Sequence, residues 1–197
     1  MEILPLFSSP LIIDRLETNV GGLGREKNHV VNGKYQSSDE FRVLERHPRL
    51  ERLILNKFKK VAKDVLGYDN EFKISTSWLT KTKKGEESKI HNHRNCFYSG
   101  VYYYGNYPDD SGEIEFQSPV GELSDFYLIP NQWNMINSEV WALMPQKNMI
   151  IFFPSYLCHK VCEHKDDTLR HSLAFNFIPI GEYGRQDSYY NSSWQVK

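Results

Sequence analysis

Two histidines separated by one residue, His91 and His93, stand just before a segment rich in β-forming residues, 97–104. Side chains at positions i and i+2 of a strand point to the same face, so the two imidazoles can converge on one point. A third histidine, His159, ends another apolar β-type segment, and Arg170 follows eleven positions later. Two close ligands, a distant third and a nearby arginine are typical of a mononuclear metal site with an anion-binding position beside it.

The length and composition of the chain favour a single strand-rich domain spanning residues 1–197. We expect an N-terminal strand, loop and support helix in residues 1–67, a β core in 68–180 and a C-terminal tail in 181–197. The high aromatic share, 14% with 12 tyrosines and 11 phenylalanines, favours strands. The net charge of −1 gives no electrostatic indication of nucleic acid or of a membrane surface as partner.

Cysteine usage and the absence of long apolar segments bear on location. Three cysteines, Cys96, Cys158 and Cys162, are an odd number, which argues against a disulfide framework. The segment after Met1 shows no basic region followed by an apolar run, so it predicts no secretory signal. No apolar stretch approaches the roughly 18 residues of a membrane span. We therefore expect a reduced, cytoplasmic protein.

The N-terminal third predicts one edge strand, one loop and one helix. Residues 3–16 contain Pro5 and Pro10 and indicate an edge strand, whereas the glycine-rich residues 18–38 indicate a loop. Residues 48–66 show helical spacing, with Gly67 placed to end the helix. We expect its buried stripe to contain Leu50, Ile54, Val61 and Val65.

The remaining chain alternates short strand candidates with turns. Strands are predicted over residues 72–81, 97–104, 113–117, 138–143, 149–153 and 169–178, with turns over 83–87 and 106–112. A helical N-terminal third followed by many short strands predicts a mainly β fold, with N-terminal helices packed against a β-sandwich or double-sheet barrel.

Four motifs in this order resemble the Fe(II)- and 2-oxoglutarate-dependent dioxygenases: Ile-His-Asn-His, Ser-Gly-Val-Tyr-Tyr-Tyr, Phe-Phe-Pro-Ser-Tyr-Leu-Cys-His and Arg-His-Ser-Leu-Ala-Phe-Asn. The resemblance runs from about residue 78 to 177 and is strongest to a group of small oxygenases of bacteria and tailed phages. It implies a double-stranded β-helix (jelly-roll, cupin-like) and an enzyme that hydroxylates an unknown substrate, with dioxygen and 2-oxoglutarate as co-substrates and succinate and CO₂ as co-products. A phage-encoded protein would act in the host cytoplasm.

The resemblance also implies the metal ligands. Fe(II) in these enzymes takes two histidines and a carboxylate on one face. His91 and His159 match the two histidines, and His93 occupies the position that is usually Asp or Glu. Imidazole does not neutralise a charge on the metal as a carboxylate does, so the redox poise and the choice of metal stay open. No catalytic side chain is expected beyond the metal centre.

The far carboxylate of 2-oxoglutarate is expected to bind Arg170, because a guanidinium presents a fork matched to two oxygens. Ser172, Tyr103 and Ser99 resemble positions whose hydroxyls reach the same carboxylate. The prime substrate stays unknown. Residues 21–38 and 123–137 are candidate substrate loops, and the second one carries Phe126, Tyr127 and Trp133.

Other interpretations stay open. A three-histidine, cupin-like metalloprotein would leave Arg170 without a task, and a non-catalytic jelly-roll binding module would need no metal. Structural zinc could use the cysteines, but Cys158 and His159 are adjacent and would face apart on a strand. Glu113 and Glu115 could supply a carboxylate ligand, although sheet charges are the simpler interpretation. The oligomeric state is not indicated.

Overall fold

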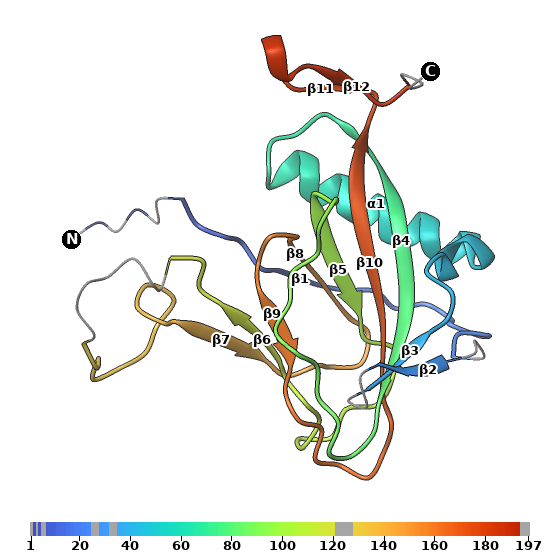
Figure 1. The fold of residues 1–197 in the computed structure, drawn as a ribbon, viewed down its shortest axis with the longest axis vertical. Helices are drawn as coiled ribbons and strands as arrows, with labels where there is room; N and C mark the ends of the chain where they lie inside the picture. The colour runs from blue at the N-terminus through green and yellow to red at the C-terminus, as the bar shows by residue number, and fades with distance from the viewer. Residues whose placement is uncertain are drawn as a thin grey trace.

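A computed structural model of the chain describes residues 2, 4, 7–24, 28–31, 35–120 and 128–193. Its strands form two principal antiparallel sheets (Figure 1). The major sheet runs in the order β1 (Ile12–Arg15), β8 (Met149–Pro154), β5 (Tyr98–Tyr102), β10 (Arg170–Ile180), β4 (Glu71–Thr82), β3 (Tyr35–Ser38) and β2 (Asn28–Val31). The minor sheet runs β7 (Val140–Leu143), β6 (Ile114–Gln117) and β9 (His159–Val161).

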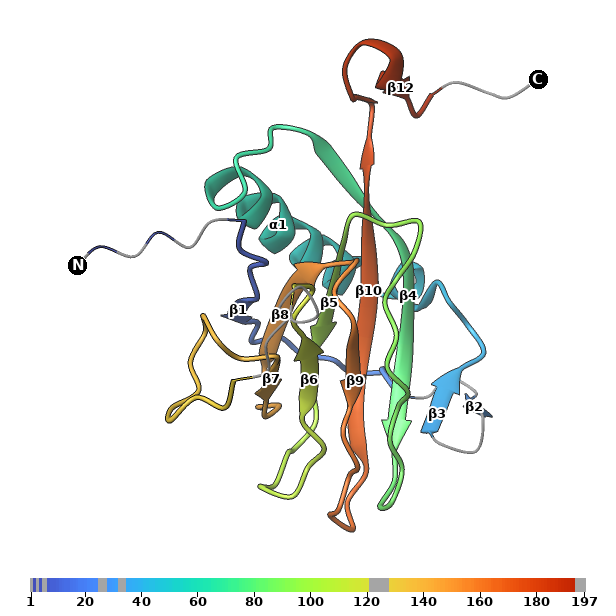
Figure 2. The same ribbon diagram turned by 60° about the vertical axis from the view of Figure 1, so that its left-hand side comes forward.

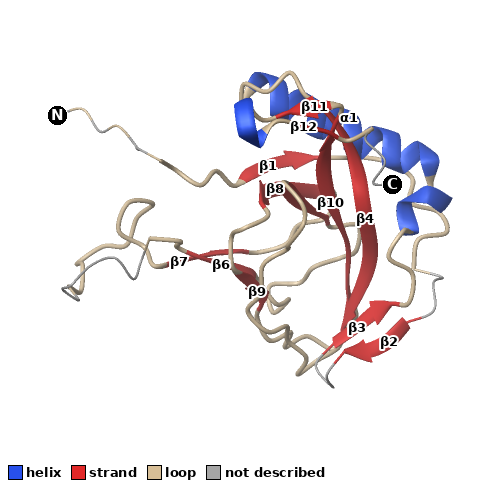
Figure 3. Ribbon diagram, turned by 45° about the horizontal axis from the view of Figure 1, so that its top comes forward, coloured by secondary structure: helices blue, strands red, loops and turns tan. Residues whose placement is uncertain are grey.

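The major sheet is covered on both faces. Figure 3 shows the helix α1 (Pro48–Asp64) on one side of it and the minor sheet on the other, and Figure 2 gives a second view of the same layers. Two hydrophobic clusters result, one under α1 and one between the sheets. This arrangement confirms the predicted mainly β class and the double-stranded β-helix.

Central strands of the major sheet bury both of their faces. In β5, Tyr98 and Tyr102 pack under α1, whereas Val101 belongs to the cluster between the sheets. In β8, Phe152 and Phe153 divide in the same way. Strands buried on both faces appear in a sequence as unbroken apolar runs, which explains why residues 149–153 could be predicted as a buried strand.

The predicted helix is confirmed, with one error at its end. α1 has proline in its first turn, and Gly67, at a φ of 73°, takes the left-handed conformation that ends it. The N–H of Tyr68 then donates to the Ala62 carbonyl oxygen over 2.8 Å. Val65 is wrong as a stripe residue, because the helix ends at Asp64 and Val65, 61% exposed, borders a surface groove instead.

Six strands lie where the sequence predicts them, and the N-terminal prediction is partly wrong. β1 is an edge strand, although shorter than predicted, and the part around Pro5 lies outside the described residues. The predicted loop 18–38 contains the β2–β3 hairpin, which pairs with β4. The hydroxyl of the fully buried Ser38 accepts the Leu79 N–H over 3.0 Å. The position of β3 therefore depends on hydrogen bonds to β4, which is distant in the sequence.

Short elements complete the described chain. The 3₁₀ turn η1 (Val43–Arg46) precedes α1, and β11 (Glu182–Tyr183), η3 (Gln186–Ser188) and β12 (Tyr190–Asn191) form a small hairpin in the predicted tail. β9, a strand of three residues, lies outside the predicted strands. Among the described residues, no helix is long and apolar enough to cross a membrane.

Phe58 is the centre of the contact between α1 and the major sheet, and sequence analysis did not identify it. Its ring stacks on Phe177 at 3.9 Å between centroids and also contacts Phe72 and Phe152. We expect Phe58→Ala to lower the free energy of unfolding by about 3–5 kcal/mol, because it removes a fully buried ring and leaves a cavity. Urea unfolding measures this, with the fully exposed Phe7→Ala as control. Equal losses in both variants would contradict it.

Candidate metal centre

Three histidines converge between the two sheets. His91 forms a β-bridge with His159, in which each backbone N–H donates to the other residue's carbonyl oxygen over 2.8–2.9 Å. The His93 N–H donates to the Ser155 carbonyl oxygen over 3.0 Å. His91 and His93 therefore lie in the segment before β5, while His159 begins β9. One ring nitrogen from each histidine lies within 4.8 Å of the other two, so a single ion could contact all three.

The Nδ1 atoms of His91 and His159 are held by backbone carbonyls. His91 Nδ1 lies 2.8 Å from the Lys89 oxygen, and His159 Nδ1 lies 2.9 Å from the Leu157 oxygen. A carbonyl can only accept, so each Nδ1 carries the proton and donates it. The lone pair of each ring is then on Nε2, the nitrogen left for a metal.

His93 is held by side chains instead. Its Nδ1 lies 2.7 Å from Asn176 Oδ1 and 2.8 Å from Ser99 Oγ. The Asn176 amide nitrogen donates to Thr76 Oγ1 over 2.9 Å, which turns the amide oxygen toward His93. The Ser99 hydroxyl also donates to that oxygen, over 2.7 Å. His93 Nδ1 therefore donates as well, and its Nε2 is left free in the same way.

Burial keeps two of the rings neutral. Desolvation lowers the pKa of His159 to about 3 and that of His93 to about 4, with the neighbouring His91 contributing in the same direction. Both imidazoles are thus unprotonated at neutral pH, which is the form that binds a metal. Three imidazole nitrogens as ligands suit Fe(II), Zn(II), Cu(II) or Ni(II) rather than Mg²⁺ or Ca²⁺.

The alternative ligand sets are not supported. In the described part of the chain, the three histidines are the group whose donor atoms converge, and no cysteine joins them. Glu115 forms an ion pair with Lys160 at 3.2 Å, as expected of a sheet charge. Among the described residues, the converging group thus consists of three histidines and contains no carboxylate.

Asn176 should control metal affinity through His93. We expect Asn176→Leu to weaken Mn(II) binding about 10–100-fold, the usual loss when the residue that orients a ligand is removed. Asn176→Asp keeps an oxygen acceptor for Nδ1 and should bind within severalfold of the wild type. Anaerobic calorimetry with Mn(II) measures both, and equal affinity in Asn176→Leu and the wild type would contradict the role.

A buried arginine lines the same cavity as the three histidines. Arg170 is 1% exposed, and its Nε donates to the Gly112 carbonyl oxygen over 2.9 Å. Among the described residues, neither its Nη1 nor its Nη2 has a hydrogen-bond partner, and neither does the Tyr103 hydroxyl. The guanidinium carbon lies 5.4 Å from the centre of the Tyr103 ring. A buried cation without a counter-charge is costly, so these donors fit a bound carboxylate.

The two parts share one cavity. The histidine cluster, Arg170 and Tyr103 all line it. Ser172 lines it too, with Oγ 2.5 Å from the Thr80 hydroxyl. Burial raises the pKa of Tyr103, partly offset by the Arg170 charge, so its hydroxyl stays protonated and can donate. Ser99 is not among the residues that line the cavity, and its hydroxyl lies 2.8 Å from His93 Nδ1.

Two supporting residues were not identified from sequence. Asn176 shares the face of β10 with Arg170 and Ser172, so the period of two could have pointed to it. His164 is fully buried, with Nε2 donating to the Thr168 carbonyl oxygen over 2.6 Å and Nδ1 3.4 Å from the Gly112 N–H. A Cβ at Gly112 would lie 2.2 Å from the Cys162 oxygen, so only glycine fits where Arg170 is held.

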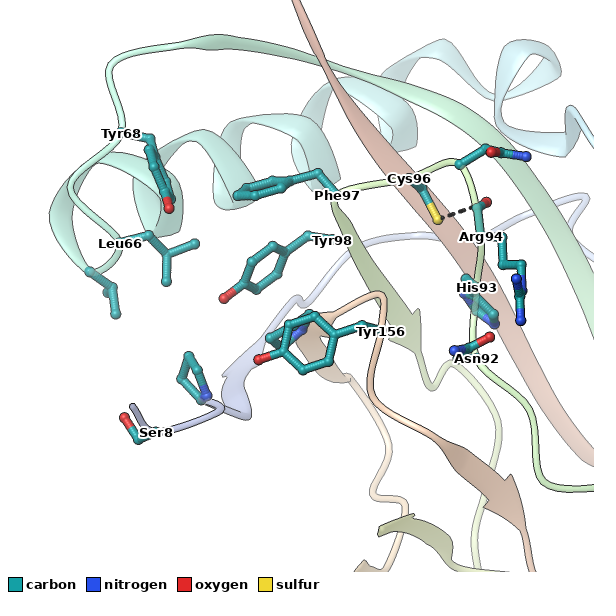
Figure 4. Close-up of a pocket in the computed structure, with 14 residues that line it drawn as sticks. Ser8, Leu66, Tyr68, Asn92, His93, Arg94, Cys96, Phe97, Tyr98 and Tyr156 are labelled. Atoms are coloured by element: carbon teal, nitrogen blue, oxygen red, sulfur yellow. Dashed lines mark hydrogen bonds between the residues drawn. The ribbon is translucent and has the colours of Figure 1, made fainter. Parts of the chain in front are cut away.

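A surface groove of about 1010 Å³ borders His93. Figure 4 shows His93 and Asn92 at one end of the groove and Tyr68 and Leu66 at the other. Aromatic side chains line much of its length: Tyr68, Phe97, Tyr98 and Tyr156. His93 borders both the groove and the inner cavity, so the groove lies next to the histidine cluster. Of the predicted substrate loops, Phe126 and Tyr127 lie outside the described residues, and Trp133 is half-exposed, away from the groove lining.

A family model described as "Putative 2OG-Fe(II) oxygenase", where 2OG is 2-oxoglutarate, matches residues 76–176. This match spans β4 to β10 and includes all three histidines and Arg170. Among curated proteins, none matches the sequence significantly.

Solved structures with the same fold are distant in sequence. HygX from Streptomyces hygroscopicus, with nickel and 2-oxoglutarate bound, has a TM-score of 0.63 at 10% identity and covers 87% of this chain and 83% of its own. An oxidoreductase of the 2OG-Fe(II) oxygenase family from Burkholderia pseudomallei has a TM-score of 0.57 at 14% identity, covering 78% and 72%. At these identities the likeness establishes the fold alone.

Proposed function

The chain belongs to the 2OG-Fe(II) oxygenase family, and from that premise we propose that its three clustered histidines bind Fe(II) while Arg170 holds 2-oxoglutarate. The proposed reaction is hydroxylation of an unidentified prime substrate by dioxygen, with succinate and CO₂ as co-products. One observation carries the proposal. The buried Arg170 guanidinium has two unpaired ends among the described residues and opens on the cavity that the histidines line.

In this proposal the residues of the chain bind the metal ion and the co-substrate and orient them relative to each other. Bound Fe(II) and 2-oxoglutarate together would supply the oxidising power. Three neutral imidazoles leave the double charge of the ion uncompensated, so the negative co-substrate would balance it. His93 thus makes the site more dependent on an anionic partner than a carboxylate in its place would.

Arg170, Tyr103 and Ser172 would fix the distal carboxylate. The guanidinium offers two free nitrogens in a planar fork, and the neutral Tyr103 hydroxyl adds a third donor. The Ser172–Thr80 hydroxyl pair can turn one proton toward the cavity. These donors lie in a water-excluding interior, where hydrogen bonds to a charged group are strong. Ser99 we assign to His93 rather than to the carboxylate, which departs from the sequence expectation.

The prime substrate would approach through the aromatic groove of Figure 4. Its lining includes Arg94 and, among the residues that the structure describes, no acidic side chain. A cytoplasmic location is also proposed, since the three cysteines are free and need no oxidising compartment. A bacterial or phage origin stays a prediction.

The second candidate function is a three-histidine metalloprotein that does not use 2-oxoglutarate. The absence of a carboxylate from the histidine cluster in the described residues favours it. Against it stands Arg170, because an uncompensated buried cation beside the metal site would then have no role.

Turnover of 2-oxoglutarate without prime substrate tests the proposal. We expect slow turnover of 2-oxoglutarate even without prime substrate, so anaerobically Fe(II)-loaded protein should release succinate after oxygen is added, measured by mass spectrometry. Arg170→Ala and His159→Ala should release none. Metal binding without any 2-oxoglutarate binding would transfer the assignment to the three-histidine metalloprotein. Protein that binds no metal at all would contradict both.

A further inference from the structure

The connection that leads into β7 carries an exposed apolar surface. We call residues 128–143 the apolar arm, and Figures 1 and 3 show it extending away from the body of the molecule. Its exposed large side chains are Leu128, Ile129, Trp133, Met135, Ile136, Val140 and Trp141. Ile129 is 78%, Met135 87% and Ile136 71% exposed. Several large apolar side chains exposed along one short segment of a folded protein indicate an interaction site.

The arm also lacks charge. Glu139 is its single ionisable residue in a stretch of sixteen. Depletion of charged residues together with enrichment in tryptophan and methionine is the composition found at the centre of protein–protein interfaces.

The tip of the arm is ordered by its own hydrogen bonds. The Asn137 amide oxygen accepts the Asn134 N–H and its amide nitrogen donates to the Gln132 carbonyl oxygen, over 2.8 and 3.0 Å. The Asn134 side chain in turn accepts the Ile136 N–H over 2.8 Å. This network holds Met135 and Ile136 outward before any partner is present. A pre-ordered apolar tip loses little conformational entropy on binding.

The arm ends in an edge strand without protection. In the described part of the chain β7 pairs on one edge only, with β6. Its four residues, Val-Trp-Ala-Leu, include no lysine and no proline, the residues that usually blunt an edge. The outer edge therefore presents backbone N–H and C=O groups that can pair with another strand.

We propose that the occupant of this surface is a second copy of the chain, joined through antiparallel pairing of the two β7 strands and packing of the two arms. An edge strand paired antiparallel with its own copy obeys two-fold symmetry, so each arm meets the same surface on its partner. The two three-stranded minor sheets would become one continuous sheet.

The area and the charge fit this partner. If the exposed parts of these seven residues were all buried, they would contribute roughly 900 Å² per protomer, and a standard protein interface buries about 800 Å² on each side. The chain has a net charge of −1, so two copies repel each other little. This inference is independent of the proposed enzymatic function.

Sedimentation velocity and light scattering of the full chain test the proposal. Interfaces of this size have dissociation constants from micromolar to picomolar, so at roughly 100 µM the wild type should be mainly a dimer of the 23.2 kDa chain. The Met135→Glu/Ile136→Glu variant should be monomeric, with dimer affinity weakened about a hundredfold or more, because two carboxylates would be buried at the contact. Hydrogen exchange of the β7 amides should slow as the concentration of the wild type rises.

Val65→Glu is the matched control, since it puts the same charge on a 61% exposed apolar site outside the arm, and it should remain dimeric. Unchanged Mn(II) binding in the double variant would show that it is folded. A wild type that is monomeric at roughly 100 µM would overturn the proposal. A dimer that survives in the double variant, or without β7 protection, would place the interface elsewhere and overturn it too.

Discussion

Replacing Arg170 with alanine is expected to weaken 2-oxoglutarate binding by some hundreds-fold or more. The guanidinium is buried, and in the described structure its two Nη atoms have no protein acceptor. The co-substrate carboxylate would therefore be its counter-charge. Losing one partner of a buried charge pair costs about 3–5 kcal/mol. Since about 1.4 kcal/mol is a tenfold change in affinity, the loss is about a hundredfold to a few thousandfold.

Measuring metal affinity distinguishes a specific loss of 2-oxoglutarate binding from misfolding of the Arg170→Ala variant. Arg170 is not part of the histidine cluster, so Mn(II) binding in the absence of 2-oxoglutarate should barely change in Arg170→Ala. Arg170→Lys keeps the charge but loses the planar fork, and its affinity should lie between the two. Anaerobic titration of 2-oxoglutarate into the Mn(II)-loaded proteins measures all three. Equal affinity in Arg170→Ala and the wild type would refute the carboxylate assignment.

Replacing His91 or His159 with alanine is expected to abolish metal binding. Each removes one of three ligands whose donor nitrogens lie within 4.8 Å of each other, and a hydrogen-bonded Nδ1 leaves Nε2 available in each ring. Calorimetry with Mn(II) and Zn(II) measures the loss. His171→Ala is a matched control, because this half-buried histidine on β10 lies outside the cluster. Metal retained in both ligand variants would disprove the assignment.

His93 allows a finer test of the third ligand. His93→Ala should weaken metal binding, whereas His93→Asp replaces the imidazole with a carboxylate, which can also bind Fe(II), and should retain it. The carboxylate would also neutralise one charge on the ion, so His93→Asp should bind 2-oxoglutarate less tightly than the wild type does. If His93→Ala binds metal as well as the wild type, His93 is not a ligand.

Short sequence motifs were enough to locate the candidate ligands and Arg170 relative to the predicted strands. His91, His93 and His159 stand beside strand signals, and Arg170 opens a strand, so their motifs carried both identity and approximate place. The contact between His93 and Asn176 joins residues 83 positions apart, and no local pattern records it. The assignment of Ser99 to the co-substrate failed to anticipate this neighbour, since only the structure brings Ser99 and Asn176 together.

For the fold, too, elements with a local residue pattern could be predicted, and elements that depend on distant contacts could not. Strands with apolar runs and the helix with its periodic stripe could be located from residue patterns alone. The β2–β3 hairpin could not, because buried serines such as Ser38 satisfy their hydrogen bonds far along the chain. Phe58 was passed over because the helical pattern was satisfied without it, although its ring makes the most extensive aromatic contacts under α1.

Along β10, residues that pack in the hydrophobic core alternate with residues that face the candidate site. Leu173, Phe175 and Phe177 face α1, whereas Arg170, Ser172 and Asn176 face the site. A slip of one position in its pairing with β4 and β5 would exchange these faces, directing phenylalanines at the histidines and the arginine into the helix core. The register that places the site residues is therefore the register that buries the phenylalanines of β10 under α1. A pairing that disrupted the site would also lose this hydrophobic burial and would be much less stable.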